Sequence, residues 1–117
     1  RNAYITQSAS TNNSLLCELQ RENSLWIHPV PAGKLGIQQG DRVEVGSPAG
    51  RGRLKARVTK ETRPDTVYMD SGFGAISKGL SNIFNKGACI AEVLEDHADN
   101  ISGNMAMHET FVTVRRV

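Results

Sequence analysis

The stretch that decides the fold runs over residues 25–60 and reads LWIHPVPAGKLGIQQGDRVEVGSPAGRGRLKARVTK. Within it, the segment 42–46 places valines at alternate positions, and the segment 53–60 alternates apolar with basic residues. Residues 48–50, Pro-Ala-Gly, separate the two segments and favour a tight turn. Alternation with a period of two is typical of a half-buried strand, so this stretch predicts a β-hairpin.

Segments outside the hairpin also have the pattern of short regular elements. They are a brief helix over 15–23, a buried strand over 25–27, one or two helical turns over 32–37 that end at Gly36, and strands over 66–69 and 110–114. Residues 70–91 are rich in glycine and lack a strong period. A stretch of that length is uncommon in a compact domain unless it is a functional loop. Together these elements predict a mainly-β fold, a small β-barrel with one or two short helices.

The composition is that of one ordinary globular domain covering residues 1–117. Of the 117 residues, 38% are apolar and 22% are charged, and the formal net charge is +2. That charge is too small to imply a polyanionic partner by itself. No stretch has the roughly 20 apolar residues that a membrane span needs. The chain begins Arg-Asn-Ala-Tyr without an initiator Met, so we expect it to be one domain of a longer protein.

Cysteine and histidine spacing gives no sign of a metal site. Cys17 and Cys89 lie far apart and neither belongs to a CxxC pair, so two free thiols are the simplest interpretation. His28, His97 and His108 are likewise not at metal-ligand spacing. No nucleophile–base pairing is visible either, so we rank a self-contained enzyme last among the possible functions.

Several segments occur in an order that resembles a known family. They are LWIHPVPAGKLGIQQGDRVEV, a basic hairpin, VYMDSGFG, SKGLSNIFNKGA and ISGNMAMHETFVTVRR. In this order they resemble the C-terminal molybdopterin dinucleotide-binding domain of the molybdopterin oxidoreductase family, of the dimethyl-sulfoxide-reductase type. The resemblance runs from Tyr4 to Arg116 and is greatest to the thiosulfate and polysulfide reductase branch. It implies a double-psi β-barrel, for which we expect six or seven strands.

The resemblance also implies a cofactor and partners. In such enzymes two molybdopterin guanine dinucleotides hold one molybdenum or tungsten, and this domain wraps part of that cofactor. The metal ligand and any iron–sulfur cluster come from preceding domains, so the isolated domain is not expected to be catalytic. The implied partners are the other domains of the catalytic subunit, an iron–sulfur electron-transfer subunit and a membrane anchor subunit, with no nucleic acid. The fragment itself does not reveal a compartment, whereas the resemblance favours a periplasmic, membrane-associated parent enzyme.

The polar opening segment carries residue types that suit a pterin. A pterin is edged with amide-like donors and acceptors, which polar side chains and fixed backbone amides can bind. The candidate residues are Thr6, Gln7, Ser8, Ser10, Thr11, Asn12 and Asn13. Composition alone favours a solvated linker here, and the resemblance favours contact with the cofactor.

The resemblance adds three further groups of candidates. They are the turn Gly72, Phe73 and Gly74, the stretch Lys86, Gly87 and Cys89, and His108 before the last strand. Glycines let backbone approach a ligand closely, and a lysine can pair with a pyrophosphate. The alternatives are a simple turn in which Phe73 fills the core, and a solvated Lys86 on the surface.

A row of basic residues follows the second hairpin strand at a period of two. It comprises Arg51, Arg53, Lys55 and Arg57. We interpret it first as a solvated face that prevents edge-to-edge pairing. The alternatives are contact with another domain of the parent enzyme, or with nucleic-acid phosphates in a small basic β-barrel that binds nucleic acid. The second alternative leaves the polar opening and the Gly-rich segment unexplained.

The same patterns predict the hydrophobic core. We expect it to contain Trp26, Ile27, Leu35, Ile37, Val43, Val45, Leu54, Val58, Val67, Phe111, Val112 and Val114.

Overall fold

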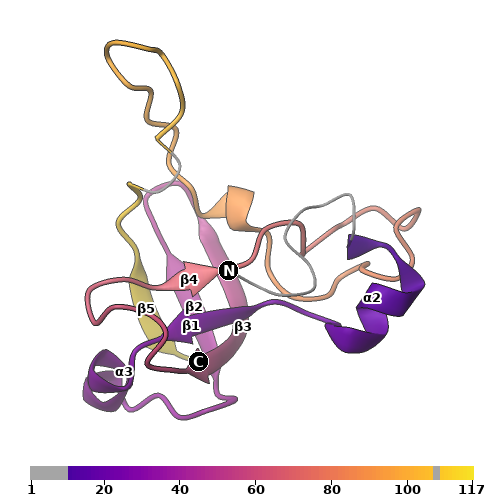
Figure 1. Cartoon of the computed structure of the whole chain (residues 1–117), viewed down its shortest axis with the longest axis horizontal. Coiled ribbons are helices and arrows are strands. Elements are labelled where there is room, and N and C mark those ends of the chain that lie inside the picture. The colour runs from indigo at the N-terminus through magenta and orange to yellow at the C-terminus, as the bar shows by residue number, and fades with distance from the viewer. Residues whose placement is uncertain (1–10, 107–108) are drawn as a thin grey trace.

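A mixed five-stranded sheet forms the body of the molecule in the order β4-β1-β3-β2-β5 (Figure 1). This computed structural model describes residues 11–106 and 109–117. The strands are β1 (Ser24–Ile27), β2 (Arg42–Gly46), β3 (Arg51–Val58), β4 (Tyr68–Met69) and β5 (Thr113–Arg116). The pair β1 and β3 is parallel, and the other neighbouring pairs are antiparallel. The mainly-β prediction is confirmed, with five strands among the described residues, fewer than expected.

The central hairpin forms as its alternation predicts. Val43 lies opposite Leu54 and Glu44 opposite Arg53, so one face of both strands is apolar and the other is charged. The backbone N–H of Ser47 donates to the carbonyl of Gly50 at 2.9 Å and closes the turn. Because β3 pairs with β1 on one side and β2 on the other, it is a central strand. The interpretation of its basic row as protection of a sheet edge is therefore wrong, although the row is exposed to solvent.

Two short helices flank the sheet, as predicted. Helix α2 (Ser14–Leu19) begins after Asn13, whose side-chain oxygen accepts hydrogen bonds from the backbone N–H groups of the first turn. It ends four residues before the predicted boundary. Helix α3 (Pro29–Leu35) starts with proline and ends at Gly36, which adopts a left-handed φ of 67°. A single 3₁₀ turn, η1 (Ile90–Glu92), follows the Gly-rich segment. Within the described ranges, no helix has the length and apolar character required to cross a bilayer.

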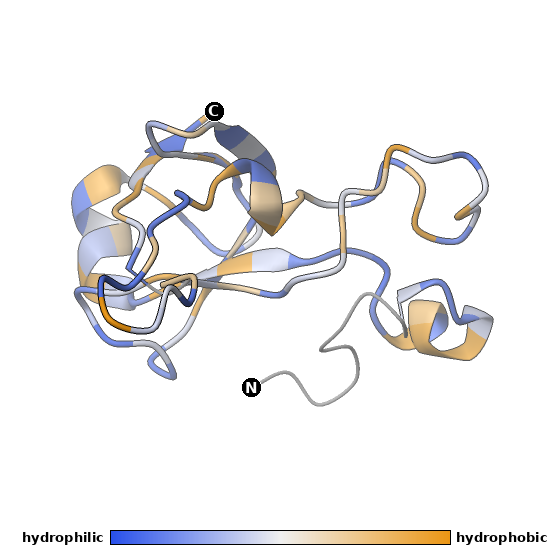
Figure 2. Ribbon diagram, turned by 90° about the horizontal axis from the view of Figure 1, so that it is seen from above, coloured by the Kyte–Doolittle hydropathy of each residue, from blue (hydrophilic) through white to orange (hydrophobic). Residues whose placement is uncertain are grey.

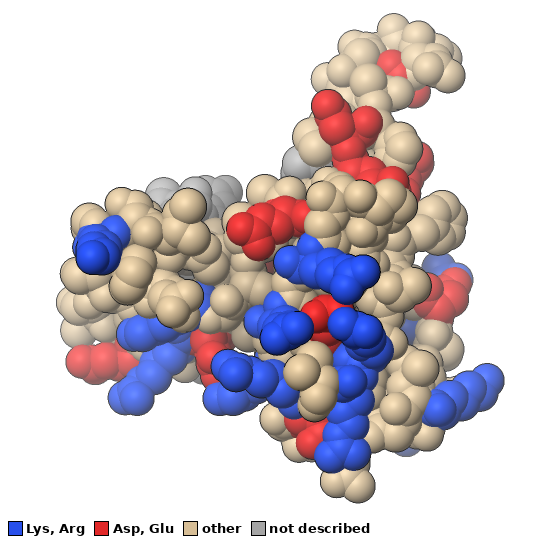
Figure 3. Space-filling model, turned by 180° about the vertical axis from the view of Figure 1, so that it is seen from behind, with Lys and Arg blue, Asp and Glu red and all other residues tan. Residues whose placement is uncertain are grey.

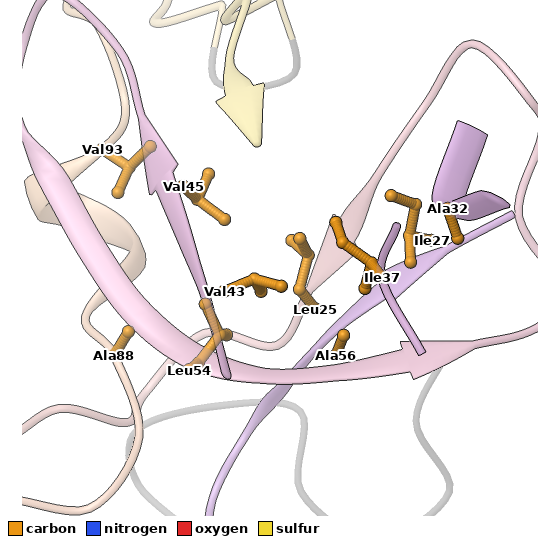
Figure 4. Close-up of a cluster of buried hydrophobic side chains, with 10 residues drawn as sticks. All are labelled: Leu25, Ile27, Ala32, Ile37, Val43, Val45, Leu54, Ala56, Ala88 and Val93. Atoms are coloured by element: carbon orange, nitrogen blue, oxygen red, sulfur yellow. The ribbon is translucent and has the colours of Figure 1, made fainter. Parts of the chain in front are cut away.

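The core lies on the concave side of the curved strand β3 (Figure 4). Its buried members are Leu25, Ile27, Ala32, Ile37, Val43, Val45, Leu54, Ala56, Ala88 and Val93. Four more predicted core residues are partly buried against this cluster, namely Val58, Val67, Val112 and Val114. Most of the predicted core is thus confirmed, and strand alternation in β1, β2 and β3 accounts for Ile27, Val43, Val45 and Leu54.

Two predicted core residues are instead exposed. Phe111 is 89% exposed because β5 begins only at Thr113, so the alternation of a paired strand does not extend to it. Leu35 is 46% exposed because α3 is short and turns Ala32 to the sheet in its place. The prediction of a strand over 110–114 was therefore placed three residues too early at its start.

Trp26 lies on the outer face of the sheet, where it is half-buried. Its neighbours in β1, Leu25 and Ile27, point into the core, so strand alternation sends Trp26 the other way. Its ring and that of Tyr68 form a T-shaped pair at a centroid distance of 5.2 Å. The guanidinium of Arg57 lies 4.2 Å from the ring centroid and covers it.

A hairpin-like arm over residues 95–106 projects from one end of the sheet (Figure 1). Ala98 and Met105 form an antiparallel bridge near its base. At its tip the carboxylate of Asp99 accepts hydrogen bonds from the backbone N–H groups of Ile101 and Ser102 and from the Ser102 hydroxyl. These bonds, the backbone N–H of Ser102 first, lower the pKa of Asp99. They also fix the turn that leaves Ile101 96% exposed.

Candidate functional site

Helix α2 and the Gly-rich segment lie side by side, to one side of the sheet (Figures 1 and 2). We call residues 11–20 and 70–89 together the Gly-rich lobe. The two stretches are joined through Asn12 and Asn82. The Asn82 backbone N–H donates to Asn12 Oδ1 at 3.1 Å, and Asn82 Nδ2 donates to the Asn12 carbonyl at 2.8 Å. Among the described residues, the end of the polar opening therefore lies against the Gly-rich stretch.

Asn23 closes the base of the Gly-rich lobe. Its side chain is fully buried, and its Nδ2 donates to the carbonyls of Asp70 at 2.9 Å and Ala88 at 2.8 Å. Its Oδ1 accepts from the backbone N–H of Ala88 at 2.9 Å. One amide side chain therefore ties together the two ends of the segment and satisfies buried backbone groups that have no strand partner.

The hydrogen bonds of Asn23, which we call the Asn23 clamp, require glycine at position 87. Gly87 has a left-handed φ of 71°, and a Cβ at this position would lie 2.2 Å from Asn23 Oδ1. The lack of a side chain thus serves the approach of Asn23, a neighbour within the chain. The sequence-based expectation was that it serves the approach of a ligand.

Asp70 extends the polar network to β4 and to α2. Its side chain is 2% exposed and accepts hydrogen bonds from the Tyr68 hydroxyl at 2.7 Å and from Gln20 Nε2 at 3.1 Å. The aromatic pair on the outer face of the sheet is therefore connected, through one carboxylate, to the Gly-rich lobe. Neither Asn23 nor Asp70 of this network was predicted from the sequence as a functional residue.

The GFG turn is packed inside the lobe. Phe73 is 2% exposed, which confirms the interpretation of this side chain as a core residue. Gly74 donates its N–H to the carbonyl of Lys86 at 2.9 Å, and a Cβ on Gly74 would lie 2.3 Å from the backbone nitrogen of Cys89. Any contact that Phe73 makes with a ligand would therefore involve its backbone, since its ring is covered.

The remaining predicted site residues differ in how they are placed. Asn13 and Lys86 are exposed, Asn12, Gly72 and Cys89 are half-buried, and Thr11 is fully buried. Cys17 donates its Sγ–H to the carbonyl of Thr11 at 2.8 Å, which fixes the start of the described chain against α2. Both cysteines are free thiols, as predicted. Thr6, Gln7, Ser8, Ser10 and His108 lie outside the described residues.

The lobe offers donors of the chemistry that a pterin dinucleotide needs. Asn12 and Asn13 use their side-chain oxygens within the domain, and each keeps an amide NH₂ group that can donate to a ring. Lys86 adds an exposed ammonium group suited to a phosphate. The described residues include no group of three or more His, Cys, Asp or Glu side chains that could hold a metal ion. The chain thus fits the organic part of such a cofactor, and the metal would need ligands from elsewhere.

Two hollows on the described surface lie away from the lobe. One, of about 1030 Å³, is lined by α3, by residues 64–67 and by the approach to β5. The other, of about 310 Å³, lies between Glu44, Arg51, Phe111 and Arg115. Neither is lined by a described member of the predicted cofactor set. Among the described members of the predicted cofactor set, Asn13 and Lys86 are the exposed ones.

Fold and lobe together define a small cofactor-cradling β domain, and the comparisons with known proteins identify its family. Residues 1–111 match the family model described as the molydopterin dinucleotide binding domain. The chain therefore belongs to this family.

Curated relatives indicate the kind of protein in which this domain occurs. The molybdopterin-containing subunit of thiosulfate reductase from Salmonella typhimurium is 32% identical over 97% of this chain and 15% of its own length. A molybdopterin-containing subunit of arsenate respiratory reductase from Chrysiogenes arsenatis is 31% identical over 84% of the chain and 12% of its own length. Dimethyl sulfoxide reductase from Escherichia coli is 29% identical over 80% of the chain and 11% of its own length. The chain thus spans about a seventh or less of the length of these relatives.

A solved structure supports the fold. Acetylene hydratase from Pelobacter acetylenicus superposes with a TM-score of 0.79 at 18% identity, over 100% of this chain and 17% of that one. At this identity the similarity shows the shared fold alone. Neither the family match nor the relatives support the nucleic-acid-binding alternative.

Proposed function

We propose that this chain binds part of a molybdenum bis(molybdopterin guanine dinucleotide) cofactor inside a larger oxidoreductase similar to thiosulfate or polysulfide reductases. The observation that carries the proposal is the convergence of the polar opening and the Gly-rich segment into one lobe, in a chain of the dinucleotide-binding family. The cofactor supplies the redox chemistry when it is bound, and this chain positions and shields it.

Within the lobe the roles follow from exposure and charge. The amide groups of Asn12 and Asn13 would donate to the edge of the pterin, and Lys86 would pair with the pyrophosphate. Cys89 would add a polar contact, and Gly72, Phe73, Gly74, Gly87 and the buried Thr11 would offer backbone groups. From outside the lobe, as the family resemblance implies, Thr6, Gln7, Ser8 and Ser10 would add polar contacts and His108 would approach the pterin. The buried clamp at Asn23 holds the groups of the lobe in one arrangement before the ligand arrives, which lowers the entropy cost of binding.

Two of the relatives are named as subunits, which supports a proposal of partner chains. We include in the proposal the other domains of a catalytic subunit, an iron–sulfur electron-transfer subunit and a membrane anchor subunit. A periplasmic location of the assembled enzyme belongs to the same proposal. The isolated chain, which has no metal-ligand cluster in its described residues, is expected to show no turnover.

The test is the cofactor content of the full-length catalytic subunit. We expect Lys86→Ala combined with Asn13→Ala to lower both the bound molybdenum and the pterin released on denaturation, by several-fold relative to wild type. Lys34→Ala, an exposed lysine in α3, is the matched control and should retain the full cofactor content. A wild-type subunit that contains no pterin, or a double variant that keeps all of it, would refute the proposal.

A further inference from the structure

The outer face of the sheet is strongly basic (Figure 3). Strand alternation and register place six cations on it, from three adjacent strands: Arg42 of β2, Arg51, Arg53, Lys55 and Arg57 of β3, and Arg115 of β5. We call these residues the basic face. The predicted cofactor lobe lies at the side of the sheet, so the proposed cofactor function makes no use of this face.

The acidic residues that pair with the basic face are too few to neutralise it. Glu44 contacts Arg51, Arg53 and Arg115. Glu22 pairs with Lys55 and Glu61 pairs with Arg57. Six cations therefore face three carboxylates, which leaves three positive charges uncompensated on one side of a small domain.

Glu44 holds three of the arginines in place. Its carboxylate side chain is 7% exposed, while those of its arginine partners are 63–69% exposed. The hydrogen bond from Arg53 lowers the pKa of Glu44 and, together with Arg115, outweighs the opposing effect of desolvation. Each guanidinium has five N–H donors and uses only some of them to bind Glu44. The remaining N–H groups face solvent in a fixed arrangement. Such pre-ordering favours docking because fewer side chains must be immobilised on contact.

The chemistry of the face favours an acidic protein over a single-stranded nucleic acid. A single-stranded nucleic acid binds by stacking bases on open aromatic rings. Here Trp26 is covered by Arg57, and the hydroxyl of Tyr68 is bound to Asp70. Exposed arginines with little apolar area are typical of a reversible, salt-sensitive interface between subunits.

We propose that the basic face docks a surface rich in Asp and Glu on a partner subunit of the same oxidoreductase. The inference rests on the proposed function, because the partner belongs to the enzyme of which this chain is one domain. The chain spans only 15% of its thiosulfate reductase relative, which is itself named as a subunit.

The first test is the salt stability of the purified enzyme complex. Arg42→Glu combined with Lys55→Glu reverses two charges and leaves the Glu44 cluster intact. We expect affinity for the partner subunit to fall about tenfold or more, with dissociation at lower salt. Lys34→Glu combined with Arg63→Glu makes the same change of net charge at exposed positions outside both the basic face and the lobe, and should dissociate like wild type. Equal weakening by both pairs, or no weakening by the first, would overturn the proposal.

Cofactor content separates this inference from the proposed function. The Arg42→Glu, Lys55→Glu subunit should keep its pterin and molybdenum while it loses its partner. An enzyme without pterin would contradict the proposed function, whereas an intact complex with full cofactor would contradict only the docking inference.

A zero-length carbodiimide crosslink identifies the partner chemistry directly, since it joins an amine to a carboxylate in contact. In the wild-type complex we expect Lys55 to be joined to an Asp or Glu of the partner subunit. Recovery of only the internal Lys55–Glu22 crosslink, or of a crosslink to another domain of the same subunit, would contradict docking of a partner subunit on this face.

The 117-residue chain alone tests protein against nucleic acid. Trp26 is its single tryptophan and lies beneath Arg57, so its fluorescence reports occupancy of the basic face. We expect poly-L-glutamate to change this signal at lower concentration than duplex DNA of equal charge. Tighter binding of the DNA would contradict a protein partner.

Discussion

The sheet and the Gly-rich lobe are held together by different forces. In the sheet, alternating strands bury Leu25, Val43 and Leu54 in a continuous apolar cluster. In the lobe, a glycine-rich backbone is fastened by amide and carboxylate side chains, above all by the buried Asn23. Apolar packing tolerates many substitutions of similar volume, whereas a hydrogen-bond clamp depends on the placement of a few atoms. The sheet is therefore the region that tolerates substitution, and the lobe is the region whose geometry depends on a few hydrogen-bonding atoms.

The largest expected effect comes from a substitution in the apolar core of the sheet. Leu25 is 1% exposed at the centre of the core, so Leu25→Ala should lower the free energy of unfolding by about 4 kcal/mol through the cavity it leaves. Leu15→Ala in α2, where the side chain is 71% exposed, should cost less than about 0.5 kcal/mol. Denaturant unfolding of the two variants checks this, and equal costs would mean that α2 is packed more deeply than the structure shows.

The second largest effect comes from removing the Asn23 side chain that holds the Gly-rich lobe together. Asn23→Ala leaves three buried backbone groups without partners and should cost about 3 kcal/mol. The loss should be local, so hydrogen exchange should accelerate in residues 70–89 while β2 and β3 stay protected. Asn100→Ala, an exposed position in the arm, serves as the control. Uniform acceleration across the sheet would show that the lobe and the sheet unfold as one unit.

Two glycines, one at the end of α3 and one in the Gly-rich lobe, allow the two regions to be compared at similar backbone conformation. Gly36 and Gly74 have similar left-handed φ values of 67° and 75°, but only Gly74 lies against backbone atoms. Gly36→Ala should cost about 1 kcal/mol from backbone strain alone. Gly74→Ala should cost about 2 kcal/mol, because its Cβ meets the Ala88–Cys89 backbone as well. Thermal unfolding of both variants measures the difference, and identical shifts would exclude the close approach.

The smallest expected effect concerns the charged outer face. The pKa of Glu44 is lowered from its ordinary value of 4.5, chiefly by the Arg53 hydrogen bond. Its stabilising contribution is therefore complete above that value and disappears as the pH falls through the lower pKa of the folded state. Wild type should lose its Tm advantage over Glu44→Gln between pH 5 and more acidic conditions, as a set of melting curves would show. A constant difference across this range would mean that Glu44 is not the titrating group.

The two regions also differ in how far sequence reasoning could reach them. The hairpin was predictable because apolar and charged residues alternate along its two strands. The end of α3 was predictable from Gly36. The clamp was not, because Asn23 binds partners 47 and 65 positions away and carries no periodic signal. The buried Phe73 was recognised only as an alternative, since a GFG turn looks the same whether its ring is covered or exposed. Phe111 was wrongly predicted to be a core residue, because the β-forming residue types around it suggested a strand from residue 110, whereas β5 begins at Thr113.

The projecting arm has a practical consequence. Its turn is fixed by Asp99, yet at its tip Ile101 is exposed to solvent, and no described element covers it. Exposed tips of this kind are where proteases nick a folded chain first. Limited digestion should therefore cut the free chain near residue 101 and spare the same bond wherever a neighbouring domain encloses the arm, so that the digestion pattern becomes a direct record of assembly.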